Sequence, residues 1–197
     1  MGQALSACCL PCLAGPSHHQ HYGYPTPHHW PRDELPGTLL EDGQLVIIRG
    51  LQQAAEHNGK EGVVLSFEPM ASRYFVRLQV EGTTIKVRPE NLLQSIAVTI
   101  DGVHERGDLN GRVGRVVGGD ERTGRYHVSV QDNVLALQPA NVVLPRGAHV
   151  RIVGLQSAPH HNGRTGVVED VDRQSRRYLV QLDAEHSLRV KWENVLL

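Results

Sequence analysis

Short apolar runs, rich in β-branched residues, alternate along the chain with turns that contain glycine, proline and asparagine. In the first such block the runs cover residues 46–49, 61–67, 74–80 and 83–88. The third run alternates and places four apolar side chains on one face: Tyr74, Val76, Leu78 and Val80. A period of two is typical of a half-buried strand, whereas no segment has a helical period of useful length. The pattern predicts an all-β fold, in which residues 89–91 form a single 3₁₀ turn because Pro89 cannot continue a ladder.

The same block occurs three times at a spacing of 52 residues. An Asn-Gly-x-x-Gly loop begins at Asn58, Asn110 and Asn162. An Arg-Tyr pair follows in each copy, at Arg73-Tyr74, Arg125-Tyr126 and Arg177-Tyr178. Each copy closes on an asparagine followed by an apolar residue, at Asn91, Asn141 and Asn194. These matches indicate tandem repeats, which we place at residues 43–93, 94–145 and 146–197.

Each repeat has the length of a small closed barrel, about 50 residues with four or five strands. The order of strand, Asn-Gly-x-x-Gly loop, strand, hairpin, strand and short turn resembles the SH3-like small barrels. The Gly-x-Val join between loop and strand resembles a KOW motif. The fuller pattern, from Asn-Gly-x-x-Gly-x-Val through Arg-Tyr-x-Val to Asn-Leu, is similar to repeats of many algal and protist proteins. The resemblance covers residues 43–197. The middle copy departs from the pattern, because Asn141-Val142 replaces Asn-Leu there. The resemblance implies neither catalytic residues nor a particular ligand.

Only residues 93–97 and 144–146 join successive repeats. Joins that short predict a semi-rigid rod of three tandem SH3-like barrels rather than a flexible string.

The second glycine of each loop is expected to have a backbone role, at Gly62, Gly114 and Gly166. We expect these residues to allow a close approach of backbone where the next strand begins, and to have positive φ, so that valine would be strained there. A binding role for the loops is the less favoured alternative.

The N-terminal sequence Met1-Gly2-Gln3-Ala4-Leu5-Ser6 fits the pattern for N-myristoylation of Gly2. One myristoyl chain binds membranes only marginally, with a constant on the order of 10⁴ M⁻¹, so a second signal is needed. A polybasic patch is missing, because Arg32 is the single basic residue among the first 42. All three cysteines of the chain lie in this segment and are the predicted palmitoylation sites: Cys8, Cys9 and Cys12. Residues 1–12 are therefore predicted to anchor the protein to the cytoplasmic face of the plasma membrane or an endomembrane.

Other interpretations of this segment fit less well. A cleaved secretory signal would have a basic start and a longer apolar stretch. Leu5-Ser6-Ala7-Cys8 resembles a bacterial lipoprotein box but begins too early to follow a signal helix. Cys9 and Cys12 have the spacing of a redox pair without the helix of a βαβ unit, and a structural zinc site would need histidines as further ligands. Because the barrels contain no cysteine, no disulfide framework supports them, which fits a reducing compartment.

Residues 13–42 contain five of the twelve histidines and little to build a core. With four prolines between Pro25 and Pro36, they are predicted to be a disordered, partly polyproline-like linker. Weak binding of a divalent metal by its histidines is the alternative to a solvated spacer.

The repeated tyrosines and arginines are the candidate partner-binding residues. Tyr74, Tyr126 and Tyr178 are predicted to be half-buried strand residues, and lining of a peptide-binding groove is the alternative. Arg73, Arg125 and Arg177 are predicted to pair with acids on a neighbouring strand or to mark a contact surface. No nucleophile, general base or carboxylate pair recurs, so we expect a non-enzymatic protein with no cofactor and no metal.

The charge balance disfavours nucleic acid as the main partner. The formal net charge is −1, with −3 on residues 1–42, +1 on 43–93, −1 on 94–145 and +2 on 146–197. A chain that neutralises phosphates would have a basic excess. Only the third repeat has a candidate basic patch, made of Arg173, Arg176, Arg177, Arg189 and Lys191. We therefore expect a lipid-anchored peripheral adaptor or scaffold whose barrels bind protein partners, with a KOW-like nucleic-acid-binding protein as the alternative.

Overall fold

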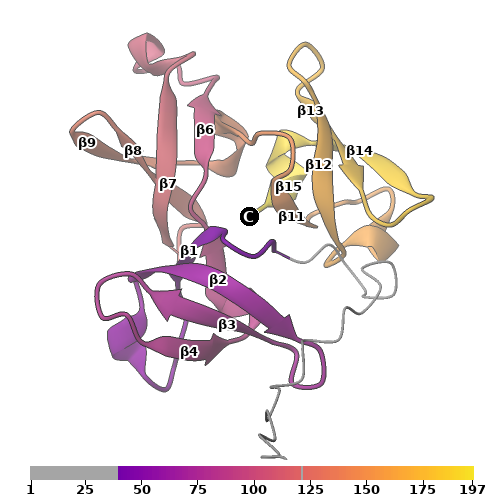
Figure 1. The fold of residues 1–197 in the computed structure, drawn as a ribbon. Coiled ribbons are helices and arrows are strands. Elements are labelled where there is room, and N and C mark those ends of the chain that lie inside the picture. The colour runs from indigo at the N-terminus through magenta and orange to yellow at the C-terminus, as the bar shows by residue number, and fades with distance from the viewer. Residues whose placement is uncertain (1–39, 121) are drawn as a thin grey trace, which may run out of the picture. The chain divides into compact units, whose positions relative to one another are not determined.

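The computed structural model describes residues 40–120 and 122–197 (Figure 1). The predicted acyl anchor, residues 1–12, and all but the last three residues of the predicted linker lie outside these ranges. Each regular element of the described part is a β-strand or a short 3₁₀ turn. The strands form three five-stranded antiparallel sheets, so the fold is all-β, with three tandem SH3-like small barrels.

Barrel 1, residues 45–94, contains the first sheet. Its strands are β1 (Leu45–Ile48), β2 (Glu61–Glu68), β3 (Arg73–Leu78), β4 (Thr84–Val87) and β5 (Leu92–Gln94), with 3₁₀ turns η2 (Ala55–His57) and η3 (Pro89–Asn91). The strand order is β4-β3-β2-β1-β5. The chain therefore runs as a meander from β1 to β4, and the short β5 returns to pair with β1.

Barrel 2, residues 97–143, has the same arrangement. Its elements are β6 (Ala97–Ile100), η4 (Gly107–Leu109), β7 (Val113–Asp120), β8 (Arg125–Val130), β9 (Asn133–Leu137), η5 (Pro139–Asn141) and β10 (Val142–Val143). The strand order is β10-β6-β7-β8-β9.

Barrel 3, residues 149–196, repeats it once more. Its elements are β11 (His149–Ile152), η6 (Pro159–His161), β12 (Thr165–Asp172), β13 (Arg177–Gln181), β14 (Ser187–Lys191), η7 (Trp192–Asn194) and β15 (Val195–Leu196). The strand order is β14-β13-β12-β11-β15.

The long second strand of every barrel has a register shift at the same place, after Val64, Val116 and Val168. A bulge there bends the strand and increases its twist, which favours closure of a small barrel.

The predicted 3₁₀ turn at Pro89–Asn91 is confirmed, and one strand boundary is wrong. Val80 was expected to continue the buried face of β3, but the strand ends at Leu78 and Val80 is 94% exposed. The reason lies in the turn, where the Gly82 amide donates to the Leu78 carbonyl and so closes the hairpin before Val80 can pair.

The two glycines of the repeated loop divide the backbone roles between them. Positive φ occurs at the first glycine, at 84° in Gly59, 83° in Gly111 and 86° in Gly163. The expectation of positive φ at Gly62, Gly114 and Gly166 is wrong. The expectation of close approach is confirmed there, because a Cβ on Gly62 would lie 2.5 Å from the Val76 side chain and one on Gly166 would lie 2.5 Å from the Gln181 carbonyl oxygen.

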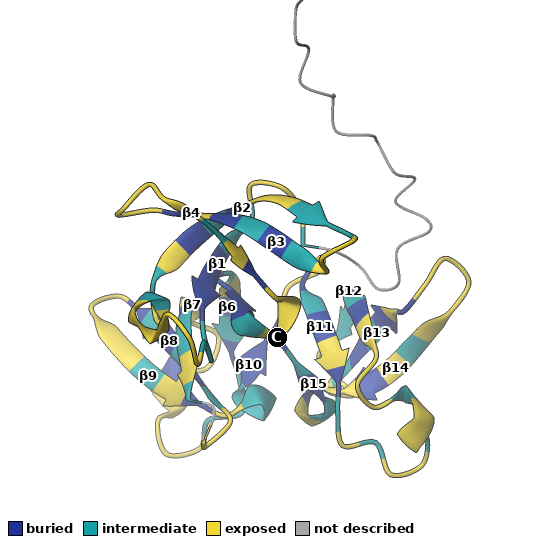
Figure 2. Cartoon of the chain, turned by 90° about the horizontal axis from the view of Figure 1, so that it is seen from below, coloured by how far each residue is buried: buried dark blue, intermediate teal, exposed yellow. Residues whose placement is uncertain are grey.

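The buried side chains form two clusters. Barrel 1 has its own aliphatic cluster around Tyr74, which includes Val46, Ile48, Val64, Val76, Leu78, Val87 and Leu92. The second cluster runs without a break through barrels 2 and 3 and also takes in Ile47 and Leu93 from barrel 1. Figure 2 shows the buried positions along the strands of each barrel. Barrels 2 and 3 therefore share one hydrophobic core.

Contacts also join barrels that are not neighbours in sequence. The Gln94 side chain, at the end of β5, accepts from the His149 amide of β11 at 3.0 Å and donates to the His149 carbonyl. The Arg49 guanidinium of barrel 1 donates to the Leu197 carbonyl oxygen at 3.1 Å. A rod, as expected from the short joins, would not bring the first and third barrels into contact.

Candidate interaction surfaces

The repeated tyrosines lie in the cores of their barrels and do not line a surface groove. Tyr74, Tyr126 and Tyr178 are 2%, 4% and 1% exposed, so the prediction of half-buried side chains is wrong. The physical reason is that each hydroxyl has a backbone partner inside the protein, which removes the need for solvent. Burial raises the pKa of all three phenols above the ordinary value.

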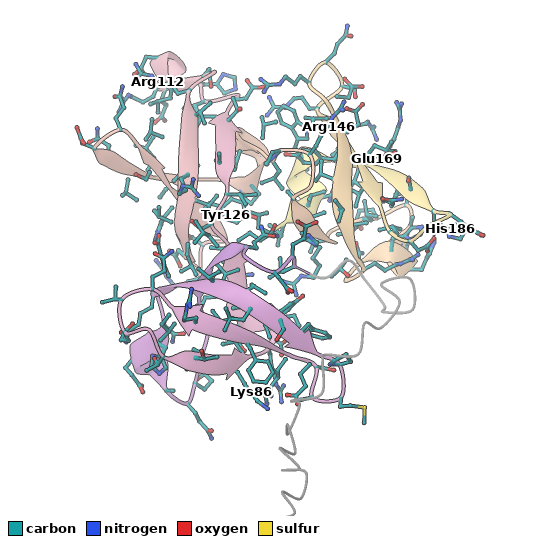
Figure 3. The ribbon with its side chains drawn as sticks, viewed as in Figure 1. Lys86, Arg112, Tyr126, Arg146, Glu169 and His186 are labelled. Carbon is teal, nitrogen blue, oxygen red and sulfur yellow. The ribbon has the colours of Figure 1, made fainter. Side chains whose placement is uncertain are left out.

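Each tyrosine hydroxyl binds a backbone segment outside its own sheet. In barrel 1 the Leu40 amide donates to Tyr74 at 2.9 Å, and in barrel 3 the Leu144 amide donates to Tyr178 at the same distance. Both donors precede their tyrosine by 34 residues. Tyr126 of barrel 2, labelled in Figure 3, instead receives the amide of Leu197 at 2.8 Å, from 71 residues further along. Barrels 2 and 3 thus cap each other's tyrosine, which agrees with their shared core.

The repeated arginines lie opposite acidic residues in the strand register, but within the described residues no ion pair joins them: Glu68 pairs with Lys86 instead, and Asp172 binds Ser175. Register pairs Arg73 with Glu68, Arg125 with Asp120 and Arg177 with Asp172, each between the second and third strands of a barrel. Cross-strand neighbours of opposite charge stabilise such a pair modestly. In barrel 2 the Arg125 guanidinium also donates to the Ala136 carbonyl oxygen on the next strand, at 3.1 Å.

The asparagine that begins each loop acts as a clamp. The Asn58 side chain accepts from the Leu51 amide and donates to the Leu51 carbonyl, both at 2.9 Å. Asn110 makes the same two bonds with Val103, and Asn162 makes them with Leu155. Both polar groups of the amide are therefore used within the loop, which favours a structural role for these residues.

The basic residues of barrel 3 are spread over two places. Arg177 and Lys191 are directly opposite on β13 and β14, and Arg189 lies two residues away on the same outer face. Asp172 flanks Arg177 on β12, and Lys191 lies 3.4 Å from Glu193. Arg176 leaves this face, because its guanidinium donates to the Ala140 carbonyl of barrel 2 at 2.8 Å and stacks 4.8 Å from the Trp192 ring. The candidate patch is therefore smaller than the sequence suggested and has carboxylates on both sides.

The shifted pKa values of the acidic side chains belong to surface turns and ion pairs. The Ser175 hydroxyl and amide lower the pKa of Asp172, and the Arg106 guanidinium lowers that of Asp108. His186, whose ring lies 2.6 Å from Asp183, lowers the pKa of that carboxyl. Asp108 lines a small hollow together with Arg112 and Gln131, but its shift, like the other two, follows from local hydrogen bonds.

An open apolar hollow of about 260 Å³ lies between barrels 2 and 3. Ala97, Val113, Pro145 and Val171 contribute to its walls, and Arg173 donates across it to the Thr99 hydroxyl at 3.5 Å. Within residues 40–120 and 122–197 no group of three or more histidine, cysteine or acidic side chains is arranged to hold a metal. The same part of the chain contains no helix long and apolar enough to cross a membrane.

The fold and the repeat together define the class of protein: a repeat protein made of tandem SH3-like small barrels. The asparagine side chains of its loops make their hydrogen bonds within the loops. The chain matches no protein-family model, and it matches no curated protein. The resemblance to KOW motifs and to the algal and protist repeats stays a prediction.

Proposed function

We propose that this protein is a lipid-anchored peripheral membrane adaptor whose barrels bind protein partners. The observation that supports the anchor best is the N-terminal sequence, in which a myristoylation pattern at Gly2 is followed by every cysteine of the chain, at Cys8, Cys9 and Cys12. Myristate gives a first, reversible encounter with the bilayer, and palmitate on a nearby thiol then makes it stable.

The surface of the barrels supports protein partners over polyanions. Basic and acidic residues are interspersed along the barrels, and several pair at the surface: Lys60 with Glu81, Lys86 with Glu68, and Arg146 with Asp170. A surface of mixed sign has no extended positive potential to attract nucleic acid. The large exposed apolar side chains Val113 and Val134, at 65% and 62%, offer contact area of the kind that protein interfaces use.

Fractionation of cells that express Gly2→Ala protein tests the anchor. The substitution removes the myristoyl acceptor and with it the encounter that precedes palmitoylation, so the protein is expected to move from the membrane to the soluble fraction. Gly15→Ala is the matched control, because it makes the same change outside the pattern. Labelling with alkyne analogues of myristate and palmitate reports the two modifications separately.

The triple replacement of Cys8, Cys9 and Cys12 by serine is expected to keep myristate, lose palmitate and leave weak, salt-insensitive membrane binding. Membrane association of the Gly2→Ala protein equal to that of the wild type would overturn the anchor.

The alternative, nucleic-acid binding, is favoured by one observation: Arg177, Arg189 and Lys191 share an outer face of barrel 3. Binding of residues 40–197 to duplex DNA or RNA is expected to be no tighter than about 10⁻⁵ M at physiological salt, which is ordinary non-specific affinity. A tighter complex whose affinity falls steeply with salt, and that Arg189→Ala weakens, would make this alternative the leading function.

A further inference from the structure

Each barrel has a cation at the end of its Asn-Gly-x-x-Gly loop region, close to the hairpin that follows the third strand. In barrel 1 this cation is Lys60, which forms an ion pair with Glu81 of the hairpin. In barrel 3 it is Arg164, whose guanidinium lies 3.3 Å from the carboxylate of Asp183 in the hairpin. Barrels 1 and 3 therefore supply a carboxylate to this cation from their own chain.

The equivalent cation of barrel 2, Arg112, has no such partner. The hairpin between β8 and β9 contributes the neutral Gln131, whose side-chain oxygen accepts from the guanidinium at 3.3 Å. The guanidinium also donates to the backbone carbonyl oxygen of Asp108 at 2.9 Å. Within the part of the chain that the structure describes, no carboxylate forms an ion pair with Arg112, although Asp132 lies in the same hairpin. The charge of Arg112 is left without a counter-charge in direct contact.

A second arginine adds to this charge. Arg106 occupies a position where barrels 1 and 3 have alanine, Ala54 and Ala158. Its guanidinium donates to both carboxylate oxygens of Asp108, at 3.2 and 3.3 Å, so that carboxylate is already engaged. Two positive charges, on Arg106 and Arg112, thus stand against the one negative charge of Asp108.

The residue beside the cation also differs in barrel 2. His57 in barrel 1 and His161 in barrel 3 have a ring nitrogen 3.4 and 3.5 Å from the cation of their barrel. Barrel 2 has Leu109 at this position, and its side chain is 6% exposed and belongs to the shared core. An apolar wall therefore replaces a polar contact next to Arg112.

These differences surround a hollow of about 140 Å³. Leu109, Val130 and Leu135 provide apolar wall, and Arg112 and Asn133 provide hydrogen-bond donors. Arg112 is exposed and lies next to η4 at one end of barrel 2 (Figure 3). A guanidinium beside an apolar wall suits a carboxylate on a short aliphatic stem, because the planar fork of donors matches the two carboxylate oxygens.

We propose that this hollow binds one carboxylate of a protein partner, from a glutamate side chain or from a C-terminus. The carboxylate accepts from Arg112, and its aliphatic stem packs against Leu109 and Leu135. The partner thus supplies to barrel 2 the group that Glu81 and Asp183 supply to the other two barrels. This proposal rests on the protein-binding part of the proposed function and gives the chemistry by which the partner is recognised.

Charge favours a single carboxylate over the phosphates of a membrane or a nucleic acid. Residues 94–145 have a net charge of −1, so a polyanion would meet repulsion around this one local positive charge. The equivalent cations of barrels 1 and 3 also both take a carboxylate. One exposed contact of this kind is weak, so a short peptide is expected to bind with a Kd of about 1–10 mM.

Nuclear magnetic resonance of full-length protein, with Cys8, Cys9 and Cys12 replaced by serine, tests the site with three peptides. The first is acetyl-Leu-Glu-Leu-amide, the second is its glutamine analogue, and the third is the glutamine analogue with a free C-terminal carboxylate. The Nε–H signal of Arg112 is expected to shift with a carboxylate peptide and to need at least ten times more of the capped glutamine peptide. The first and third peptides separate the two sources of the carboxylate. Equal shifts with all three peptides, or none with any, would overturn the proposal.

Gln131→Glu gives barrel 2 a carboxylate of its own at the hairpin and is expected to weaken binding of the carboxylate peptide at least tenfold. Gln79→Glu, which makes the same change at the equivalent position of barrel 1, is the matched control and is expected to leave binding unchanged. Both glutamines are exposed, so equal melting temperatures show that the variants are folded. Binding that Gln131→Glu leaves intact would place the peptide elsewhere and overturn the proposal.

Inorganic phosphate is the competing probe. If phosphate shifts the Arg112 signal at a lower concentration than the glutamate peptide does, the hollow is a phosphate site and the proposal is wrong. Peptides that fail to bind remove this site alone, because membrane association of the Gly2→Ala protein is measured independently of it. Wild-type-like membrane association of Gly2→Ala would overturn the anchor and leave the peptide titration unaffected.

Discussion

At the scale of single residues, the repeated glycines divide into two kinds that the sequence alone does not separate. Gly59, Gly111 and Gly163 have positive φ with open space around them, so any other residue there would be strained by the backbone conformation and not by crowding. Gly62, Gly114 and Gly166 have ordinary φ and no room for a side chain. The Asn-Gly-x-x-Gly pattern contains both, and only the path of the neighbouring strand shows which glycine faces it.

Gly114→Ala is therefore expected to destabilise barrel 2 by overpacking, at about 1–3 kcal/mol. A Cβ there would lie 2.7 Å from the Ser129 carbonyl oxygen and 2.6 Å from the Val128 side chain, so β7 and β8 must move apart. Gly107→Ala is the matched control in the same barrel, because its Cβ would meet nothing within 4 Å. Urea denaturation of the two variants measures the difference, and equal midpoints would contradict this explanation.

The buried tyrosines make stability sensitive to alkaline pH. Desolvation holds the pKa of Tyr178 and Tyr126 above the ordinary tyrosine value of 10.0, so the folded state keeps these hydroxyls protonated after the unfolded state has released its protons. The stability that they contribute is fully present below pH 10 and is lost as the pH rises through the interval between the unfolded and folded pKa values. The urea midpoint is expected to fall above pH 10 in the wild type and to fall less in a Tyr126→Phe, Tyr178→Phe double variant.

At neutral pH the single variant Tyr178→Phe is expected to cost about 1–3 kcal/mol, because it leaves the buried Leu144 amide without its acceptor. A pH profile of the double variant that superimposes on that of the wild type would contradict the assignment to tyrosine.

At the scale of elements, the apolar runs located β1 to β4 of barrel 1, with a period of two in residues 74–80, and Pro89 located the 3₁₀ turn before the last strand. The short closing strands β5, β10 and β15 were not predicted, because two or three residues are too few to show alternation. The burial of the tyrosines was missed for a different reason. Their hydroxyl partners, Leu40, Leu144 and Leu197, come from outside each sheet, and a local pattern does not indicate a distant backbone donor.

The asparagine clamp gives a prediction at this scale. Asn162→Asp keeps the acceptor for the Leu155 amide but removes the donor to the Leu155 carbonyl, and Asn162→Ala removes both. We expect losses of about 0.5–1 and 1–2 kcal/mol, in that order, because a typical net hydrogen bond contributes about 1 kcal/mol. Thermal melts of the two variants give the ranking, and an aspartate variant less stable than the alanine variant would show that the acceptor bond matters little.

At the scale of the whole molecule, the continuous core predicts that barrels 2 and 3 respond together. Val180→Ala in barrel 3 removes a fully buried side chain and is expected to cost about 2 kcal/mol. Hydrogen exchange measured by mass spectrometry should then show faster exchange in β7 and β8 as well as in barrel 3. Val76→Ala in barrel 1, which belongs to the separate cluster, is the matched control and should accelerate exchange mainly in β2 and β3.

The bond between Tyr126 and Leu197 also has a consequence for synthesis on the ribosome. Barrel 3 finds its tyrosine partner, Leu144, in chain already made, whereas barrel 2 waits for a residue 71 positions later. At about 5–20 residues per second, several seconds pass between the synthesis of Tyr126 and the synthesis of Leu197. During that interval the strands of barrel 2 are already made, but the Tyr126 hydroxyl lacks its Leu197 donor and barrel 3 does not yet cover the shared core. Barrel 2 is therefore the repeat that a nascent-chain chaperone would meet in an incompletely folded state.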